Sequence, residues 1–189
     1  RVMSILADTT NTLAEGEVLQ LMNRQDASLT EADYFDVIYR KTAKLFESSA
    51  EIVAVDTPYQ SAMADYGRHL GLCFQIIDDL LDYTGSSQKT GKNIGDDLAE
   101  GKMTLPLIYA MESANAEQRQ HIQNTIKQPS EEALPSILTC IESSQAIPRC
   151  HKQAQQQGKL AIAAIEPLPH SKYKQTLLDL VQFALQRHY

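Results

Sequence analysis

Three aspartates and a glutamine interrupt one of the most apolar stretches of the sequence, residues 74–83. An α-helix turns about 100° per residue, so with Gln75 at zero Asp79 falls at about +40°, Asp82 at about −20° and Asp78 at about −60°. The four polar side chains share one arc, and Phe, Ile and Leu fill the rest of the circumference. This pattern predicts a central bundle helix whose acidic stripe faces inward or into a cleft.

The negative charge of such a stripe must be neutralised by a bound or neighbouring cation. Carboxylates four residues apart repel each other, and burial increases the free-energy cost of this repulsion. Mg²⁺ is well suited to this: the ion takes carboxylate oxygens, keeps several waters and bridges to phosphate. We therefore expect Asp78, Asp79 and Asp82 to be metal ligands. The alternative is an acidic face that is simply solvated, which the apolar residues on both sides disfavour.

A polar segment with glycines and lysines, Thr90–Lys102, follows the stripe. Lys92 and Lys102 lie there beside a second acidic pair, Asp96 and Asp97. Lysines next to a metal stripe suit a phosphate-bearing ligand, because lysine acts as a mobile point charge. The spacing is not that of a Walker loop. Taken alone, the segment could equally be a solvated loop.

An upstream helical pattern carries Lys41 and Thr42 among apolar neighbours, with Lys44 expected to be exposed on the same helix. Lys41 could also be an ordinary exposed lysine, so a functional role depends on whether other functional residues lie near it. Gly67 and Gly71 precede the stripe on its own helix, where glycine lowers helix propensity. They predict either close helix packing or room for a ligand, and Gly16 is interpreted in the same way.

The rest of the chain predicts one all-α domain, because apolar spacings of three and four recur and no convincing strand is found. Expected N-caps are Thr30, Asn115 with Gln118, and Ser171, and Asp97–Glu100 has the spacing of a capping box. About eight helices are expected, near residues 1–24, 30–55, 57–83, 104 onward, 115–128, 131–143, 148–166 and 171 onward, with a short turn at 97–100.

Composition excludes several classes of protein. The net charge of −7 makes nucleic acid an improbable partner, and no apolar run approaches the roughly 20 residues of a membrane span. Cys73, Cys140 and Cys150 show no CxxC spacing, which argues against zinc and against a disulfide framework. A reducing, cytoplasmic setting is expected.

Three ordered motifs together resemble the trans-polyprenyl diphosphate synthases: KTA at Lys41–Ala43, GxxFQxxDDxxD at Gly71–Asp82 and TGKxxGDDxxEGKxTLP at Thr90–Pro106. AEGEVLQL near the start is also similar, and the likeness is greatest to the bacterial octaprenyl branch that makes quinone side chains. The resemblance implies an isoprenoid-synthase-type helical bundle around a central cavity, and a homodimer. It also implies Mg²⁺-assisted condensation of isopentenyl diphosphate onto an allylic diphosphate, with ionisation to an allylic cation.

The resemblance assigns roles residue by residue. Asp78, Asp79 and Asp82 match the second aspartate-rich motif, with Asp78 the best candidate for direct metal contact. The residues matched to the substrates are Lys41, Thr42 and Gln75 at the allylic diphosphate and reacting carbon, and Lys92 and Lys102 at the diphosphate. Asp96 and Asp97 are expected to orient the loop.

The sequence departs from the family pattern in its first half. The first aspartate-rich motif with its arginine pair is absent from the 189 residues, as are the residues that bind isopentenyl diphosphate and set chain length. These are expected upstream of Arg1, so residues 1–189 are expected to be the C-terminal portion of one synthase domain, inactive alone. Ser49–Gln60 also looks shorter than usual. The alternatives are a non-catalytic helical subunit and a terpene cyclase, and the apolar product allows loose membrane association.

Overall fold

The computed structural model describes residues 1–84 and 94–187, and this part of the chain contains helices and no strand. The all-α prediction is therefore confirmed for the described residues. The elements are α1 Val2–Met22, α2 Glu31–Ile38, η1 Tyr39–Ala43, α3 Lys44–Val53, α4 Gln60–Thr84, α6 Asp96–Ala99, α7 Leu105–Ser113, α8 Ala116–Lys127, η2 Glu131–Ala133, α9 Leu134–Ser143, α10 Ala146–Ala164 and α11 Lys172–Leu185.

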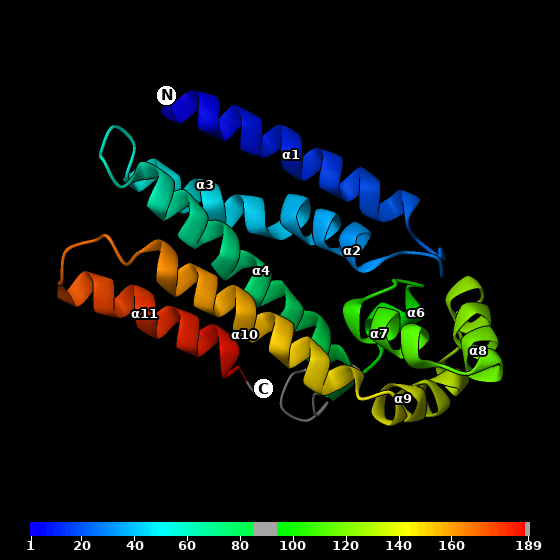
Figure 1. The fold of residues 1–189 in the computed structure, drawn as a ribbon. Helices are drawn as coiled ribbons and strands as arrows, with labels where there is room; N and C mark the ends of the chain where they lie inside the picture. The colour runs from blue at the N-terminus through cyan, green and yellow to red at the C-terminus, as the bar shows by residue number, and fades with distance from the viewer. Residues whose placement is uncertain (85–93, 188–189) are drawn as a thin grey trace.

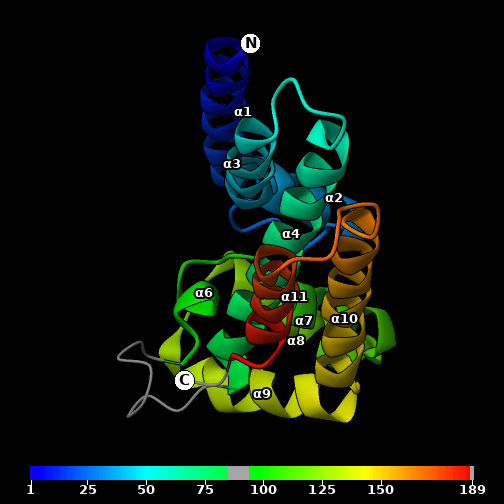
Figure 2. The same cartoon turned by 90° about the vertical axis from the view of Figure 1, so that its left-hand side faces the viewer.

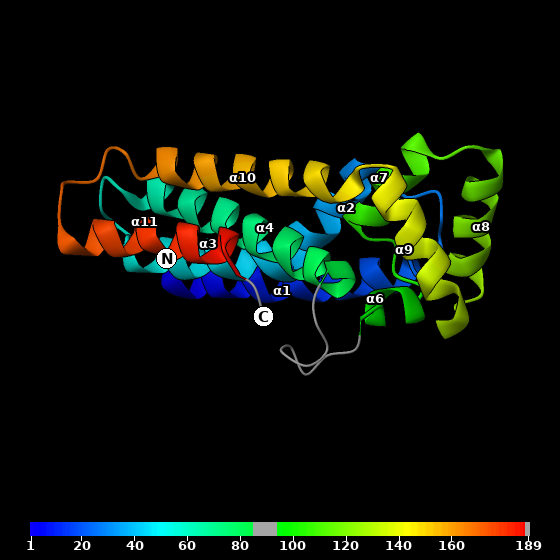
Figure 3. The same ribbon diagram turned by 90° about the horizontal axis from the view of Figure 1, so that it is seen from below.

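The helix that carries the acidic stripe, α4, is central to the bundle. It packs most extensively along α10 and α3, and it also contacts η1 and α11. Figure 1 shows α1, the α2–α3 pair, α4, α10 and α11 as long neighbouring helices, with α6 to α9 gathered at one end. The same division is visible from below (Figure 3), and Figure 2 views the bundle from the end opposite to α6 to α9. A helix buried on most sides must be apolar on most sides, which is the pattern read from residues 74–83.

Side-chain caps explain where several helices begin. Thr30 and Asp33 form a capping box at α2, Asn115 and Gln118 form one at α8, and Ser171 accepts the Lys174 N–H at α11. These three predictions are confirmed. The predicted box at Asp97–Glu100 is wrong: α6 begins one residue earlier, after Gly95, whose φ of 87° turns the chain without a side-chain cap.

The helix predicted over residues 30–55 is interrupted by the π-helical turn η1, which contains Lys41 and Thr42. Two glycines allow neighbouring helices to approach this turn. A Cβ on Gly16 would lie 2.8 Å from the Lys41 backbone nitrogen, and one on Gly71 would lie 2.6 Å from the Ala43 Cα. Both distances are well inside van der Waals contact. The glycines therefore permit close helix packing, as one of their two interpretations predicted.

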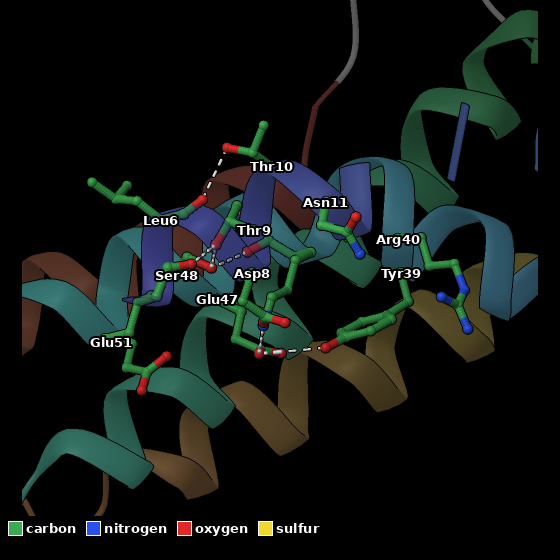
Figure 4. Close-up of polar contacts among 12 residues, drawn as sticks. Leu6, Asp8, Thr9, Thr10, Asn11, Tyr39, Arg40, Glu47, Ser48 and Glu51 are labelled. Carbon is green, nitrogen blue, oxygen red and sulfur yellow. Dashed lines mark hydrogen bonds and ion pairs between the residues drawn. The ribbon is translucent and has the colours of Figure 1, made fainter. Parts of the chain in front are cut away.

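The register after η1 differs from that of an uninterrupted helix, and Lys44 is buried rather than exposed as expected. Its Nζ lies 2.9 Å from Asp8 Oδ2 and 3.0 Å from Glu47 Oε1. Burial alone would lower the pKa of Lys44, but the two carboxylates outweigh it and raise the pKa. Figure 4 shows the two carboxylates, Asp8 on α1 and Glu47 on α3, with the Thr9 and Ser48 hydroxyls hydrogen-bonded beside them.

Two predictions from composition can also be compared with the structure. Cys73, Cys140 and Cys150 are free and buried, so none of them forms a disulfide. Within the described residues, no helix combines the length and apolar character that crossing a bilayer requires.

Candidate functional site

A cavity of about 250 Å³ lies where α1, η1, α4 and the segment following α6 meet. Its described lining residues are Gln20, Val37, Ile38, Lys41, Thr42, Gln75, Asp78, Asp97, Glu100 and Lys102. Side chains from three separate predicted motifs therefore line one cavity, but two of the three predicted metal ligands, Asp79 and Asp82, are not among its described lining residues. Lys92, predicted to bind diphosphate, lies outside the described residues.

The π-helical turn presents Lys41 and Thr42 to this cavity. Thr42 Oγ1 donates a hydrogen bond of 2.8 Å to Gln75 Oε1 on α4. The Gln75 amide nitrogen in turn donates to Asp79 Oδ1 at 3.0 Å, which fixes the orientation of the amide. Lys41 remains partly exposed and lies 3.3 Å from Glu17 Oε1 on α1. The turn and the acidic helix are thus joined by a chain of hydrogen bonds at the cavity wall.

Asp79 differs from the other aspartates of the stripe, because it is 1% exposed and is absent from the described cavity lining. Its Oδ2 accepts a 2.7 Å hydrogen bond from the Tyr34 hydroxyl on α2. Its Oδ1 accepts from Gln75 and from Lys102 Nζ, the latter at 2.9 Å. Three donors therefore surround this buried carboxylate.

Lys102 connects the stripe to the second acidic pair. Its Nζ also donates to Asp97 Oδ1 at 3.1 Å, and its side chain is 21% exposed. Burial alone would lower the pKa of Lys102, but Asp79 and Asp97 outweigh it and raise the pKa. The lysine therefore stays protonated. Since an ammonium group has three donors, one remains for a ligand in the cavity.

Asp82 lies one helical turn beyond Asp78 on α4. Burial raises the pKa of Asp82 to about 6, partly offset by the hydrogen bond of 3.2 Å that its Oδ2 accepts from the Asp97 N–H. Burial, followed by the charge of Asp79, likewise raises the pKa of Asp97. Both carboxyls are therefore harder to ionise here than in water, mainly because they are buried.

Asp78 lies on the cavity wall and faces an arginine from the end of the chain. Arg187 Nη2 is 3.5 Å from Asp78 Oδ1, and the Arg187 side chain is 7% exposed. The guanidinium carbon also lies 4.2 Å from the ring centroid of Phe74. The Arg187 guanidinium is thus already close to Asp78, the aspartate that the sequence favoured most as a direct metal ligand.

The carboxylates of this chain could supply only part of the coordination shell of Mg²⁺. Among residues 1–84 and 94–187, no group of three or more His, Cys, Asp or Glu side chains is arranged to hold a metal ion. Asp78 and Asp82 can supply one or two carboxylate ligands. Mg²⁺ is commonly held by one or two carboxylates, with waters and substrate phosphates completing its shell. The residues present therefore suit an ion that arrives with a phosphate ligand.

Sequence reasoning missed several side chains at the site, namely Gln20, Tyr34, Glu100 and Arg187. Gln20 lies in the AEGEVLQL stretch, four residues after Gly16, so helical spacing could have placed it near η1. Tyr34 lies seven residues, about two turns, before Lys41, but the π-helical turn between them changes the register. Nothing local to Arg187 indicates its partner, which is more than a hundred residues away.

Comparisons with known proteins agree with the motifs. A family model for polyprenyl synthetases matches residues 1–141. The chain is 47% identical to an octaprenyl diphosphate synthase from Haemophilus influenzae, over 100% of this chain and 59% of that protein. It is 43% identical to an all-trans-nonaprenyl-diphosphate synthase (geranyl-diphosphate specific) from Rhodobacter capsulatus, over 93% of this chain and 55% of that protein.

Solved structures show the same likeness. A polyprenyl synthase from Caulobacter crescentus, determined in complex with calcium and isoprenyl diphosphate, superposes with a TM-score of 0.93 at 35% identity. That superposition covers 100% of this chain and 59% of the other, and it confirms the predicted type of helical bundle. The chain thus spans less than two thirds of the length of these proteins.

Proposed function

Because this chain belongs to the polyprenyl synthetase family, we propose that the full-length protein is a long-chain trans-polyprenyl diphosphate synthase. It condenses isopentenyl diphosphate repeatedly onto an allylic diphosphate. We propose an octaprenyl product, used for quinone side chains, from the similarity to an octaprenyl synthase. The nonaprenyl relative is only slightly less identical, so the product length has to be measured.

One observation carries this proposal. Lys41, Thr42, Gln75, Asp78 and Lys102 come from three motifs up to 61 positions apart, and they line a single cavity. The described lining combines two lysines, Lys41 and Lys102, with three acidic residues, Asp78, Asp97 and Glu100. That combination suits an anionic diphosphate that brings a divalent cation with it.

The residues of this chain have distinct roles in the proposed reaction. Lys41 and Lys102 hold the diphosphate and offset the charge that grows on it as it departs. The oxygens of Thr42 and Gln75, held together by their hydrogen bond, face the positive charge that develops on the allylic carbon. Lys92 is proposed as a further diphosphate ligand. Asp97 keeps Lys102 in place, and Asp96 helps to orient the loop.

Asp78 and Asp82 are the proposed holders of Mg²⁺ within this chain. The ion, when bound, would act as a Lewis acid that neutralises the leaving diphosphate. Asp79 belongs to the same predicted metal motif, but its burial and its three donors favour a different role. The first aspartate-rich motif and the isopentenyl diphosphate site are proposed to lie in the part of the protein that precedes Arg1.

The proposal is tested with full-length protein, Mg²⁺, an allylic diphosphate and labelled isopentenyl diphosphate, with product length determined by chromatography. We expect chain elongation, and at least about a hundredfold loss of rate in Asp78→Ala, in line with losing a major electrostatic stabiliser. Activity and Mg²⁺ dependence that survive this substitution would refute the metal role. Elongation only after a second polypeptide is added would identify a helical subunit, and cyclic products made without isopentenyl diphosphate would identify a cyclase.

Two proposals concern assembly and location. We propose a homodimer formed through α1, whose Val18, Leu21 and Met22 side chains are 56%, 61% and 75% exposed. Sedimentation of the full-length protein as a monomer at micromolar concentration would contradict this. The three free cysteines support a reducing cytoplasmic setting. The apolar product supports loose membrane association, which vesicle flotation with and without product can test.

A further inference from the structure

We propose that Asp79 is a positioning residue that holds the catalytic side chains in place, and that Tyr34 is the buried donor that fixes Asp79. This role rests on the proposed function, and it removes Asp79 from the set of direct metal ligands. It also assigns a part in catalysis to α2, a helix that contributes none of the predicted motif residues.

The surroundings of Asp79 leave little access for a metal ion. The residue is 1% exposed, and both of its oxygens already accept hydrogen bonds: Oδ2 from Tyr34, and Oδ1 from Gln75 and Lys102. Mg²⁺ requires a near-octahedral shell at about 2.0–2.1 Å from each oxygen. The three donors occupy three of the roughly four acceptor sites of the carboxylate, and only Oδ2 keeps a free one. With 1% of the residue exposed, there is little room beside that oxygen for an ion and its shell of waters and phosphate oxygens.

The same three hydrogen bonds join the parts of the site that come from different segments. Through Gln75, Asp79 sets the amide that accepts from Thr42 on the π-helical turn. Through Lys102, it sets one of the two lysines among the described lining residues of the cavity. A single carboxylate thus connects α2, α4, the π-helical turn and the segment after α6. Its removal is expected to displace several functional groups at once.

Tyr34 is well suited to fix this carboxylate because it is itself immobilised. Its side chain is buried, at 4% exposed. The helix that carries it begins with the Thr30 capping box, and Glu31 in its first turn accepts a 2.8 Å hydrogen bond from Gln153 on α10. Arg149 of α10 also lies 3.6 Å from Glu31. The start of α2 is thus tied to the helix that packs along α4.

The hydroxyl of Tyr34 is a reliable donor. Burial raises its pKa well above the usual range, and the charge of Asp79 raises it further, so the phenol keeps its proton. The Tyr34→Phe substitution preserves the ring and removes only this donor. A buried carboxylate oxygen would then lack its partner, and Asp79 would be free to turn away from Gln75 and Lys102.

The test uses full-length protein and compares Tyr34→Phe with Tyr66→Phe. Tyr66 is an equally buried tyrosine, 3% exposed, whose hydroxyl donates at 2.8 Å to the Leu177 carbonyl, away from the cavity. Both variants lose one buried phenol hydrogen bond, so their melting temperatures measure the purely structural effect. Steady-state kinetics then give kcat and the KM for each diphosphate. Direct Mn²⁺ binding is measured by electron paramagnetic resonance with a non-reactive thiolo analogue of the allylic diphosphate.

The Mn²⁺ affinities of Asp79→Asn and Asp78→Asn distinguish a positioning residue from a metal ligand, because only the loss of a ligand should weaken metal binding strongly. Asp79→Asn can keep one acceptor oxygen for Tyr34 but replaces the oxygen that accepts from Gln75 and Lys102 by an amide nitrogen. Its kcat therefore tests the positioning role of Asp79 if Tyr34→Phe is too unstable to purify, and a wild-type kcat would contradict that role. We expect Tyr34→Phe to lower kcat about tenfold, the size of a lost buried hydrogen bond, while Tyr66→Phe stays within about twofold. Mn²⁺ affinity is expected to change less than about threefold in Tyr34→Phe and Asp79→Asn, and at least about tenfold in Asp78→Asn.

Two results would overturn the proposal. One is a kcat for Tyr34→Phe equal to that of Tyr66→Phe. The other is a loss of Mn²⁺ affinity in Asp79→Asn as large as that in Asp78→Asn, which would make Asp79 a direct ligand. If the unmodified full-length protein condenses nothing, the proposed function fails instead. The Mn²⁺ measurements would still decide whether Asp79 binds metal.

Discussion

The contact between Gly71 and the π-helical turn offers a quantitative test of how the site is built. Replacing Gly71 by alanine adds a Cβ that would lie 2.6 Å from the Ala43 Cα and 3.1 Å from the Phe46 Cβ. Carbon atoms in contact normally lie about 3.5–4.0 Å apart. The backbone of α4 and the turn must therefore separate by about 1 Å, because the nearest obstacle is a main-chain atom rather than a movable side-chain tip.

This separation acts on the site through the next turn of α4. Gln75 lies four residues after Gly71, and its 2.8 Å hydrogen bond from Thr42 crosses the same interface. Adding about 1 Å takes that distance beyond hydrogen-bonding range. Overpacking costs about 1–3 kcal/mol, and alanine returns up to about 1 kcal/mol of helix propensity. We expect a net loss of about 1–2 kcal/mol, or about 2–8 °C in Tm.

The assay combines melting curves by circular dichroism with the condensation kinetics of full-length protein. A misplacement of about 1 Å can cost up to about a hundredfold in rate, so kcat should fall much more than stability does. Gly158→Ala is the matched control on α10. Its added Cβ would meet only side-chain ends, at 3.0 Å from Leu185 Cδ1 and 3.2 Å from Val181 Cγ1. It should keep its activity and melt within about 2 °C of the wild type.

The reasoning would be refuted by a Gly71→Ala protein that keeps both the wild-type kcat and the wild-type Tm. That result would mean that the turn can move away from α4 without consequence for Thr42 and Gln75. Equal losses in Gly71→Ala and Gly158→Ala would also refute it, since the two sites differ in whether backbone or side-chain atoms obstruct the new methyl group.

Three further predictions concern two charged side chains and the activity of the 189-residue chain by itself. Lys44→Met should destabilise the protein by up to about 3 kcal/mol in urea, because Glu47, whose side chain is only 12% exposed, then lacks its cation, and adding Glu47→Leu should recover most of the loss. Asp82 has a pKa of about 6, above that of an unfolded aspartate. Its contribution to stability is therefore present at low pH and lost as pH rises through about 6. Without ligand and with EDTA, Asp82→Asn should thus gain stability relative to wild type as the pH rises from about 4 to about 6, and should keep that gain at higher pH. The 189-residue chain alone, with Mg²⁺ and both diphosphates, should show no condensation, because the first aspartate-rich motif is absent from it.

Each of these has a contrary outcome. A Lys44→Met protein as stable as wild type would show that Glu47 is solvated despite its low exposure. An Asp82→Asn variant whose stability follows that of wild type at every pH would show that this carboxyl is not strained by burial. Product formed by the 189 residues would show that the described cavity suffices for binding and ionisation.

Much of the local structure follows from the sequence. Thr30, Asn115 and Ser171 offer short polar side chains to free backbone N–H groups, so these helix starts could be predicted. The failure at α6 has a local reason too: Gly95 adopts a positive φ and begins the helix without a side-chain cap, a conformation that composition does not reveal.

The acidic stripe shows where sequence reasoning ends. A period of 3.6 residues placed Asp78, Asp79 and Asp82 on one face of an apolar helix and so predicted a polar site. Periodicity cannot tell which of these neighbours is covered. Tyr34 and Lys102, 45 and 23 positions away from Asp79, close over it, while Asp78 remains on the cavity wall.

The sequence by itself thus determined the helices, the acidic face and the lysine-bearing motifs, because capping and periodicity depend on neighbours within a few residues. Only the tertiary structure decided that Lys44 is buried, that Lys41 and Thr42 lie on a π-helical turn, and that Asp79 is enclosed by three donors. Those outcomes depend on how closely separate helices pack, as Gly16 and Gly71 allow at the π-helical turn. Such close approach is a property of the packed bundle and of no single segment.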